Sequence, residues 1–416
     1  MNTLFVLHKD PDLSLGGVER HTIDLATKLV QRGYTVYLLF PSSPAFVVAH
    51  VQKTGIEKKR LNGDFCQDMA VTNQYLEKNF RKLLEQYKIK QVHFQHLLGY
   101  SLSLVHAAKT MGLQVFITLH DYFFWCPNYK VISPLIGDRM GFCFFEKSEE
   151  LCSRCLSLIY QKKVDPREVC QRREYAEEML DLADMLIFPT QYIKNVYCSL
   201  FDLKEERCTV IQHGVQKTNG SGTYEPGQYL NIAYLGAFTY EKGAETFLRI
   251  IAEMNDARYT DLIRFHIIGE LGYPLPKTFR SYPNMRLSGA YKADDVNIIL
   301  KRLNIDLVML LSIWPETYSY TLSEAVVNGI PLIASDLGAL RERISSLSAG
   351  YLVPYEGPVK RSVDIIRDVY RCPELRSYFH EQCIDSSKKI PDITDMVSRY
   401  EKVYKKDLSD RTNFAG

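Results

Sequence analysis

The segment DLVMLLSIWPETYSYTLSEAVVNGIPLIASD (residues 306–336) contains two apolar runs, 306–312 and 331–336, on either side of a more polar stretch. Apolar runs of this length predict buried strands. Pro315 argues against a helix directly after the first run, so a loop is expected there. Residues that favour a helix N-cap follow it: Thr317, Ser319 and Thr321. The segment therefore predicts a strand, a loop, a helix and a second strand, which is the repeating unit of a parallel sheet.

Two glutamates, Glu316 and Glu324, lie eight positions apart in this segment. On one continuous helix eight residues turn through about 800°, so the two carboxylates would point about 80° apart and would not form a neighbouring pair. We expect Glu316 in the loop and Glu324 in the early turns of the helix. The helix start would then direct free backbone N–H groups towards an anion. The alternative is that both acids only complement the helix dipole.

The same alternation of strand and helix runs through the whole chain. Further apolar runs typical of buried strands lie at 4–7, 35–40, 91–95, 115–120, 185–190, 209–214, 231–237, 265–270 and 285–289. This pattern predicts an α/β fold with two Rossmann-like, doubly wound domains. The carboxyl ends of both sheets, facing a cleft, are then the expected ligand site.

A stretch rich in Gly, Asn, Ser and Thr (213–228) is expected to link a first domain, 1–212, to a second domain, 229–385. The last segment, 386–416, is predicted to form a terminal helix that packs one face on the body. Its large apolar residues at helical intervals are Met396, Tyr400 and Tyr404.

Length and composition limit the class of protein. A chain of 416 residues suggests two or three domains, and its net charge of +2 gives no sign of a nucleic-acid-binding surface. The apolar run near the N-terminus is too short for a signal peptide, and no run approaches the roughly 18 residues of a membrane span. Ten cysteines, mostly unclustered, fit a reducing compartment better than a disulfide framework. We expect a cytoplasmic protein.

The segment from Lys53 to Lys90 is locally basic, with nine Lys or Arg residues against five acidic ones. One interpretation is the solvated face of a helix. The other is attraction to an anionic membrane surface, at about 1 kcal/mol per well-placed charge. The second interpretation would place the protein peripherally on the inner face of the cytoplasmic membrane.

Four motifs together resemble those of the retaining family 4 glycosyltransferases, which adopt the GT-B fold. They are an E-x7-E region, a glycine turn near the N-terminus, a His-Asp pair and a G-x5-K-G loop. In this chain the motifs are Glu316 to Glu324, Gly16-Gly17, His120-Asp121 and Gly236 to Lys242-Gly243, respectively. Each motif is weak alone, but four in the expected order over about residues 1–345 are specific.

The resemblance implies a UDP- or GDP-linked sugar donor held mainly by the second domain. It also implies a saccharide or lipid-linked acceptor held mainly by the first. The reaction would retain the anomeric configuration, with the acceptor hydroxyl attacking on the face of the leaving group. No cofactor or metal would be required for catalysis. The expected function is sugar transfer in the synthesis of bacterial surface polysaccharide.

The resemblance also assigns roles to residues. Glu316 would orient the donor sugar, Lys242 would neutralise the pyrophosphate, and His120 would hydrogen-bond the sugar as a neutral imidazole. Glu324 would bind the paired hydroxyls of the ribose, because a carboxylate accepts two hydrogen bonds in fork geometry. The other expected substrate-binding residues are Gly16, Gly17, Asp121, Gly236, Tyr318, Ser319, Tyr320 and Thr321.

One position departs from the family pattern. The family usually places an arginine after the first glycine of G-x5-K-G, whereas this chain has Ala237. Either another residue, such as Arg264 or Arg341, replaces the lost cation, or the helix N-terminus carries more of the anion's charge. Three alternatives remain within this architecture: a nucleotide-sugar epimerase, a phosphorylase, and a non-catalytic sugar-nucleotide-binding subunit.

Residues 121–155 form a Cys-rich insert after the His-Asp pair. Its cysteines are Cys126, Cys143, Cys152 and Cys155, and only the last two have C-x2-C spacing. Four thiolates can close a tetrahedral zinc site, and a loop of this length needs something to order it. The alternative is four reduced thiols packed as small hydrophobes. The insert is expected to border the acceptor side of the site.

Overall fold

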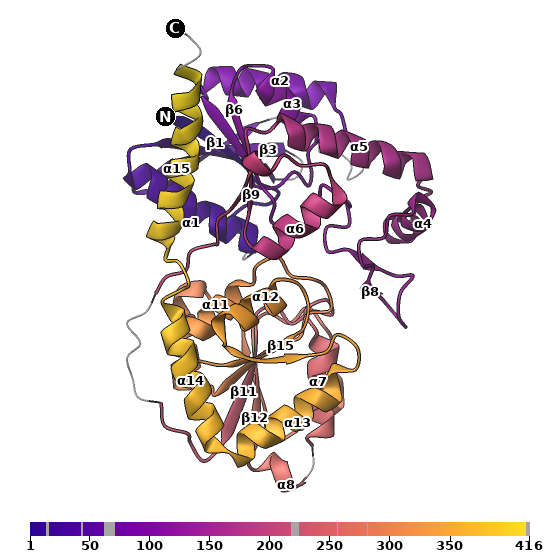
Figure 1. Ribbon diagram of the computed structural model, residues 1–416, viewed down its shortest axis with the longest axis vertical. Coiled ribbons are helices and arrows are strands. Elements are labelled where there is room, and N and C mark those ends of the chain that lie inside the picture. The colour runs from indigo at the N-terminus through magenta and orange to yellow at the C-terminus, as the bar shows by residue number, and fades with distance from the viewer. Residues whose placement is uncertain are drawn as a thin grey trace. The chain divides into compact units, whose positions relative to one another are not determined.

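The computed structural model of the protein describes residues 1–13, 16–42, 45–61, 71–217, 224–255, 257–280 and 282–412. The chain divides into two compact units. Unit 1 comprises Met1–Gly214 and Ile393–Gly416, and unit 2 comprises Val215–Asp392 (Figure 1). Within the described residues, no helix is both long and apolar enough to cross a membrane.

Unit 1 is built on an eight-stranded sheet in the order β10-β9-β6-β5-β1-β2-β3-β4. Its parallel strands are β1 (Asn2–Val6), β2 (Thr35–Ser42), β5 (Gln91–Phe94), β6 (Gln114–Thr118), β9 (Met185–Phe188) and β10 (Cys208–Val210). These strands coincide with the apolar runs of the sequence, because a parallel strand covered on both faces is apolar throughout. The sheet of unit 1 confirms the predicted Rossmann-like pattern.

Unit 1 has eight helical segments in its described part, and the terminal helix is one of them. They are α1 (Gly17–Gln31), α2 (Gln74–Gln86), α3 (Leu104–Lys109), α4 (Glu149–Tyr160), α5 (Pro166–Leu182), α6 (Gln191–Leu200), the short 3₁₀ helix η1 (Glu205–Arg207) and α15 (Ile393–Thr412). The last of these lies beside α1, where Arg32 pairs with Glu401 (Figure 1). The side chains of Met396, Tyr400 and Tyr404 are fully buried. The chain therefore returns to unit 1 after completing unit 2.

The basic segment is not the single helix face that the sequence suggested. Two antiparallel strands, β3 (Ala45–Gln52) and β4 (Gly55–Leu61), extend one edge of the sheet. Lys58, Lys59 and Arg60 lie on β4, while only the basic residues from position 78 to 82 lie on α2. Residues 62–70 lie outside the described part. The helical interpretation was wrong for residues 55–61. Charged residues with few apolar ones between them show no clear helical or strand periodicity.

Unit 2 has a six-stranded, wholly parallel sheet in the order β13-β12-β11-β14-β15-β16. The strands are β11 (Leu230–Leu235), β12 (Ile263–Ile268), β13 (Met285–Gly289), β14 (Leu307–Leu310), β15 (Leu332–Ser335) and β16 (Gly350–Val353). The strand order reverses direction between β11 and β14, which are neighbours in the sheet but not consecutive in the sequence. Ligands of open parallel sheets bind at such a reversal point, beyond the carboxyl ends of the strands. The sequence missed β16, a short edge strand that is only partly buried.

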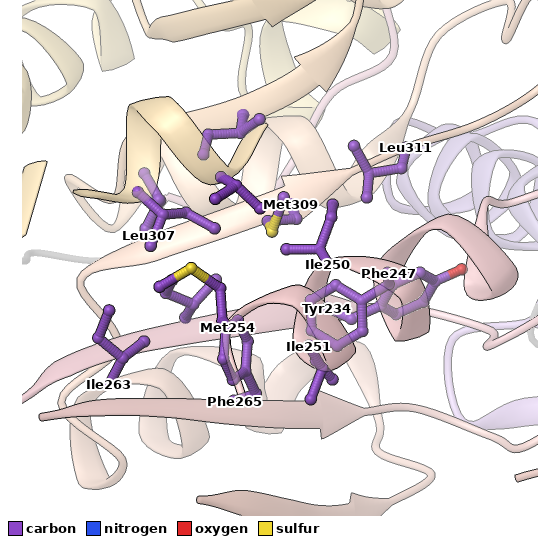
Figure 2. Packing of buried hydrophobic residues seen from close by; sticks show 14 of the residues in the cluster. Tyr234, Phe247, Ile250, Ile251, Met254, Ile263, Phe265, Leu307, Met309 and Leu311 are labelled. Carbon is purple, nitrogen blue, oxygen red and sulfur yellow. The ribbon is translucent and has the colours of Figure 1, made fainter. Parts of the chain in front are cut away.

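The helices of unit 2 pack on this sheet and fix its loops. They are α7 (Ala244–Glu253), α8 (Ala257–Thr260), α9 (Lys277–Arg280), η2 (Ala293–Asp295), α10 (Val296–Arg302), α11 (Tyr320–Val327), α12 (Gly338–Leu347), α13 (Pro358–Arg371) and α14 (Pro373–Ser387). Figure 2 shows Phe247 and Ile250 of α7 packed among side chains of the neighbouring strands, including Tyr234, Phe265 and Met309. This core holds the loops after β11 and β14 in a fixed position.

Candidate functional site

The two loops that follow β11 and β14 are packed against each other. Gly243 adopts a positive φ of 84°, and a Cβ atom at this position would lie 2.0 Å from the carbonyl oxygen of Leu311. The backbone N–H of Ile313 donates to the carbonyl of Glu241 at 3.0 Å. A glycine is therefore required where the G-x5-K-G loop meets the end of β14.

Tyr234 of β11 hydrogen-bonds the G-x5-K-G loop. Its hydroxyl lies 3.0 Å from the carbonyl oxygen of Ala237 and 3.1 Å from that of Lys242. Burial, together with the nearby charge of Glu316, raises the pKa of Tyr234 well above 10, so the hydroxyl keeps its proton and donates it. The sequence analysis did not predict this role for Tyr234, because a tyrosine within an apolar strand is typical of a core residue.

Lys242 and Glu316 form an ion pair. The Nζ atom of Lys242 lies 2.8 Å from Oε2 of Glu316, and the hydroxyl of Ser312 donates to Oε1 of the same carboxylate. Glu316 is only 3% exposed, whereas the Lys242 side chain is 36% exposed and also lies 5.7 Å from the ring centroid of Trp314. A carboxylate this buried requires such partners. Two of the expected catalytic residues thus neutralise each other.

The two glutamates occupy different elements, as the spacing indicated. Glu316 lies in the loop, and Glu324 lies on α11, where it is 4% exposed. Ser319 occupies the N-cap position of α11 with a φ of 72°, but its side chain makes no capping hydrogen bond. The carbonyl of Glu316 accepts from the N–H of Ala339 at 2.8 Å, which joins the loop to α12.

The expected contact residues at the start of α11 lie close together. A Cβ atom on Gly236 would lie 3.2 Å from Cγ2 of Thr321, so the end of β11 touches the first turn of α11. The rings of Tyr318 and Tyr320 are 5.5 Å apart, and the hydroxyls of Ser319 and Thr321 are 3.1 Å apart. Tyr318 is buried, so it supports the loop rather than offering its ring to solvent.

Arg343 of α12 is a residue of this site that the sequence did not reveal. Its guanidinium donates to the carbonyls of Tyr318 and Ser319 at 2.9 and 2.8 Å, and to the hydroxyl of Ser323 at 2.8 Å. Arg343 is 3% exposed, and its burial lowers the pKa of the guanidinium. Nothing in the local pattern marks it, because its partners lie about twenty residues earlier.

The two arginines considered as replacements for the cation missing at Ala237 have local partners. The guanidinium of Arg264 stacks 3.4 Å from the ring centroid of Tyr229. Nε of Arg341 contacts Asp336, and Arg341 also donates to the carbonyl of that residue at 3.0 Å. The residue that replaces the missing arginine therefore stays an open prediction.

In unit 1, His120 follows β6 and is almost fully buried. Its Nε2 lies 2.7 Å from Oε1 of Gln95, and its ring centroid is 5.0 Å from that of His21 and 5.1 Å from that of His213. Burial, with smaller contributions from neighbouring His21 and His96, lowers the pKa of His120 well below 6.5, so the imidazole is neutral. The sequence did not indicate Gln95 as its partner.

Asp121 holds the turn after β6. Its carboxylate accepts from the N–H of Phe123 at 2.9 Å and lies 2.7 Å from Nε2 of His96. Nδ1 of His96 accepts from the N–H of Leu98 at 3.0 Å, which leaves the His96 proton on Nε2, facing Asp121. Both carboxylate oxygens of Asp121 are thus engaged within unit 1. Its expected contact with substrate stays a prediction.

The glycine turn opens α1, directly after the first strand. Gly16 occupies the N-cap position and Gly17 is the first helical residue, while the two residues before them lie outside the described part. Glu19, in the first turn, lies 3.2 Å from Nδ1 of His8, which follows β1. The turn therefore joins the carboxyl end of β1 to a helix start.

The four cysteines of the insert surround one cavity of about 190 Å³. They are Cys126, Cys143, Cys152 and Cys155. Burial raises the pKa of all four thiols, that of Cys126 to about 12. Across the described residues, no three His, Cys, Asp or Glu side chains already form a metal-ligand set.

Comparisons with known proteins match both halves of the chain. Residues 15–218 match the family model described as Glycosyltransferase Family 4, and residues 221–385 match Glycosyl transferases group 1. Together the two models account for most of the chain. An uncharacterized 42.6 kDa protein in the cps region of Klebsiella pneumoniae is 22% identical over 423 residues, covering 97% of this chain and 98% of that protein.

Solved structures share the fold over nearly the whole chain. Sucrose-phosphate synthase from Thermosynechococcus elongatus superposes with a TM-score of 0.69 at 14% identity, covering 98% of this chain and 99% of that one. HepE from Anabaena, in complex with UDP-glucose, gives 0.64 at 14% identity, covering 98% and 100%. These similarities establish the GT-B fold, with two Rossmann-like domains. With this fold and the two family matches, which together cover most of the chain, the chain belongs among the glycosyltransferases.

Proposed function

We propose that this protein is a retaining glycosyltransferase that moves a sugar from a nucleotide-sugar donor to a saccharide or lipid-linked acceptor. The observation that carries the proposal is the Lys242–Glu316 pair beyond β11 and β14, in the unit that also holds Glu324. HepE binds UDP and UDP-glucose, which supports the donor class. The relative from the cps region supports a role in surface-polysaccharide synthesis.

In this proposal, the ion pair is the resting form of the donor site. The pyrophosphate of an incoming donor carries more negative charge than one carboxylate, so it attracts Lys242 away from Glu316. The N–H groups at the start of α11 add neutral donors to the same anion. Glu316, still held by Ser312, then accepts hydrogen bonds from the hydroxyls of the donor sugar. Glu324 binds the ribose.

The transfer step needs stabilisation of the leaving diphosphate. As the bond between the anomeric carbon and the phosphate oxygen breaks, negative charge grows on the diphosphate, where Lys242 and the helix N–H groups lie. The acceptor oxygen bonds to the anomeric carbon on the same face, and its proton passes to the departing phosphate oxygen. The configuration is thereby retained, and no divalent metal is required.

Further substrate contacts and membrane contact are also parts of the proposal. His120 would hydrogen-bond the donor sugar as a neutral imidazole, and Asp121 and the Gly16-Gly17 turn would bind substrate. Peripheral association with an anionic membrane face would use β4. Lys58 is already paired with Asp10 and Asp12, which leaves the exposed Lys59 and Arg60 for lipid headgroups.

The experiment is to incubate the protein with a panel of UDP- and GDP-sugars, with and without lipid-linked saccharide acceptors, and to identify the products. The proposal expects a glycosylated acceptor of retained configuration, formed equally well with and without added divalent metal. Sugar isomerisation without acceptor, or phosphorolysis, would instead indicate the other enzymes of this fold. Donor binding without any turnover would indicate a non-catalytic subunit.

A further inference from the structure

The Cys-rich insert contains a cavity that the proposed reaction does not use. Its four thiols come from three separate places in unit 1: the turn after β6, the chain after β8 (Gly141–Phe142), and the first two turns of α4. Figure 1 shows β8 and α4 near each other at one end of unit 1. We propose that this cavity is a structural zinc site, closed by Cys126, Cys143, Cys152 and Cys155.

Each of the four sulfur atoms faces a hydrogen-bond donor. Backbone groups of Asn128 hydrogen-bond Cys126, and those of Phe145 and Glu146 hydrogen-bond Cys143. A guanidinium N–H of Arg173 lies 3.1 Å from Sγ of Cys152, and the side chain of Ser133 hydrogen-bonds Cys155. Apolar packing of neutral thiols needs none of these donors. Donors directed at sulfur are the outer partners that hold and orient metal-bound thiolates.

The charges around the cavity also suit four thiolates. Zinc with four thiolates carries a net charge of −2, which a buried site must balance. Arg172 is 3% exposed, and its guanidinium donates to the carbonyl oxygens of Phe123 and Phe124 rather than to a carboxylate. Arg172 and Arg173 therefore offset part of this negative charge, to which the carboxylate of Glu146, another residue lining the cavity, adds one further unit.

The insert has little regular structure of its own. Between β6 and α4 it contains only two strands of two residues each. Some of its aromatic residues are buried, including Trp125 and Phe142, whereas Phe144 is 62% exposed. A loop of this length needs something to order it. A bound zinc would fasten α4 and the β7–β8 hairpin (Ile132–Ser133 and Gly141–Phe142) to the turn that Asp121 begins.

The four thiols line one cavity without converging into a ligand set, so zinc binding requires the sulfur atoms to move closer together. Zinc displaces one proton from each thiol, forms four Zn–S bonds of about 2.3 Å, and releases four protons to solvent.

The first test is elemental analysis of the full-length protein, purified without chelators under reducing conditions. We expect about one zinc per chain and no comparable iron. Exchange of zinc for cobalt should give the absorption bands of tetrahedral cobalt bound to thiolates. Absence of stoichiometric metal, an iron–sulfur chromophore, or disulfides among the four cysteines would each overturn the proposal.

The second test compares cysteine variants. Cys152→Ser with Cys155→Ser should remove the zinc, whereas Cys170→Ser, on the neighbouring helix α5, should keep it. If the double variant fails to fold, chelation of the wild type replaces it: strong chelator should expose four additional reactive thiols. An unchanged thiol count after chelation would contradict the site. Neither readout depends on sugar transfer. The zinc proposal can therefore fail or hold independently of the proposed function.

Discussion

The two units place different chemistry at the carboxyl ends of their sheets. In unit 1, the side chains after β5 and β6 are already paired within the unit: neutral His120 with Gln95, and Asp121 with His96. In unit 2, the loops after β11 and β14 carry opposite charges that meet as Lys242 and Glu316. The Lys242 side chain is 36% exposed, whereas Glu316 is buried. The same architecture therefore places a group of buried imidazoles in unit 1 and a partly exposed ion pair in unit 2.

The difference follows from burial. Neutral imidazoles can be stacked inside a sheet edge, because burial lowers the pKa of each and so keeps them uncharged. A carboxylate as buried as that of Glu316 needs charged or hydrogen-bonding partners, which Lys242 and Ser312 provide. Under the proposed function, a diphosphate separates this ion pair. Each prediction below changes one unit and uses the other, or the other glutamate, as reference.

The largest expected effect concerns glycine packing. Gly243→Ala in unit 2 should cost several kcal/mol, because its Cβ would lie 2.0 Å from the carbonyl oxygen of Leu311. Gly33 in unit 1 has a similar φ of 89°, but no atom lies within 4 Å of its added Cβ. Gly33→Ala should therefore cost only about 1–2 kcal/mol, for the left-handed backbone alone. Denaturant unfolding of both variants measures the difference, and equal losses would refute the close packing of the loop.

Glu316→Gln should reduce turnover by about tenfold to a hundredfold, as expected for a lost charged hydrogen bond of about 1.5–3 kcal/mol. The same substitution releases Lys242 from its ion pair. Binding of a nucleoside diphosphate should therefore be unchanged or tighter. Steady-state kinetics and calorimetry on the same preparation provide the two readouts. Wild-type activity in this variant would remove Glu316 from the site.

Glu324→Gln should fail in the opposite way. The ribose is present in both donor and product, so this variant should bind the nucleoside diphosphate about tenfold more weakly. Turnover at saturating donor should fall less than in Glu316→Gln, because the ribose contact is made equally before and during transfer. The two glutamates thus serve as controls for each other. Equal losses of diphosphate affinity would rule out separate roles.

Much of the fold could be predicted because parallel strands are apolar along their whole length. The strands around β11 and β14 were found in this way, as was the loop that separates Glu316 from the helix of Glu324. The edge strands were harder. β16 is short, and the β3–β4 hairpin carries exposed charged residues on β4, so neither has the apolar run of a buried strand.

Residues of the candidate site were predicted only where they belong to a short sequence motif. Lys242 and Glu316 stand in recognisable motifs, but their mutual ion pair depends on which strands become neighbours. Arg343 and Gln95 act through partners about twenty or more residues away in sequence. Such contacts are set by packing across helices and strands, and a single sequence does not encode them in any local spacing.

The stability of the two units should also depend differently on pH. Burial lowers the pKa of His8, His21, His93 and His120 in unit 1, that of His21 to about 3. Below about pH 6.5 the unfolded chain binds protons that the folded unit does not, so stability is complete above this pH and is lost as pH falls. Each histidine contributes up to about 1.4 kcal/mol per pH unit.

Hydrogen exchange measured by mass spectrometry at pH 7 and pH 5.5 provides the test. After correction for intrinsic rates, peptides from β5 and β6 should lose more protection than those from β11 and β14. Unit 1 has four histidines with lowered pKa values among its described residues. In the described part of unit 2 there are two, His266 and His380. His21→Gln should reduce the pH dependence of unit 1. Equal losses of protection in both units would contradict the assignment.

The smallest expected effect is membrane binding. Lys59 and Arg60 are adjacent, exposed residues on β4 of unit 1, and Lys301 and Arg302 form an equivalent exposed pair on α10 of unit 2. Reversing either pair to glutamate changes the net charge of the chain by the same amount. If β4 contacts lipid, only the change in unit 1 should weaken co-sedimentation with anionic vesicles.

We expect a loss of about tenfold or more at low salt, since each well-placed charge contributes about 1 kcal/mol near such a surface. Both pairs should give the same small loss if the attraction follows net charge alone. Wild-type protein that stays in the supernatant would remove membrane contact from the proposal altogether. In every case sugar transfer to a water-soluble acceptor should be unaffected, because neither pair lies at the ends of the parallel strands where the motifs gather.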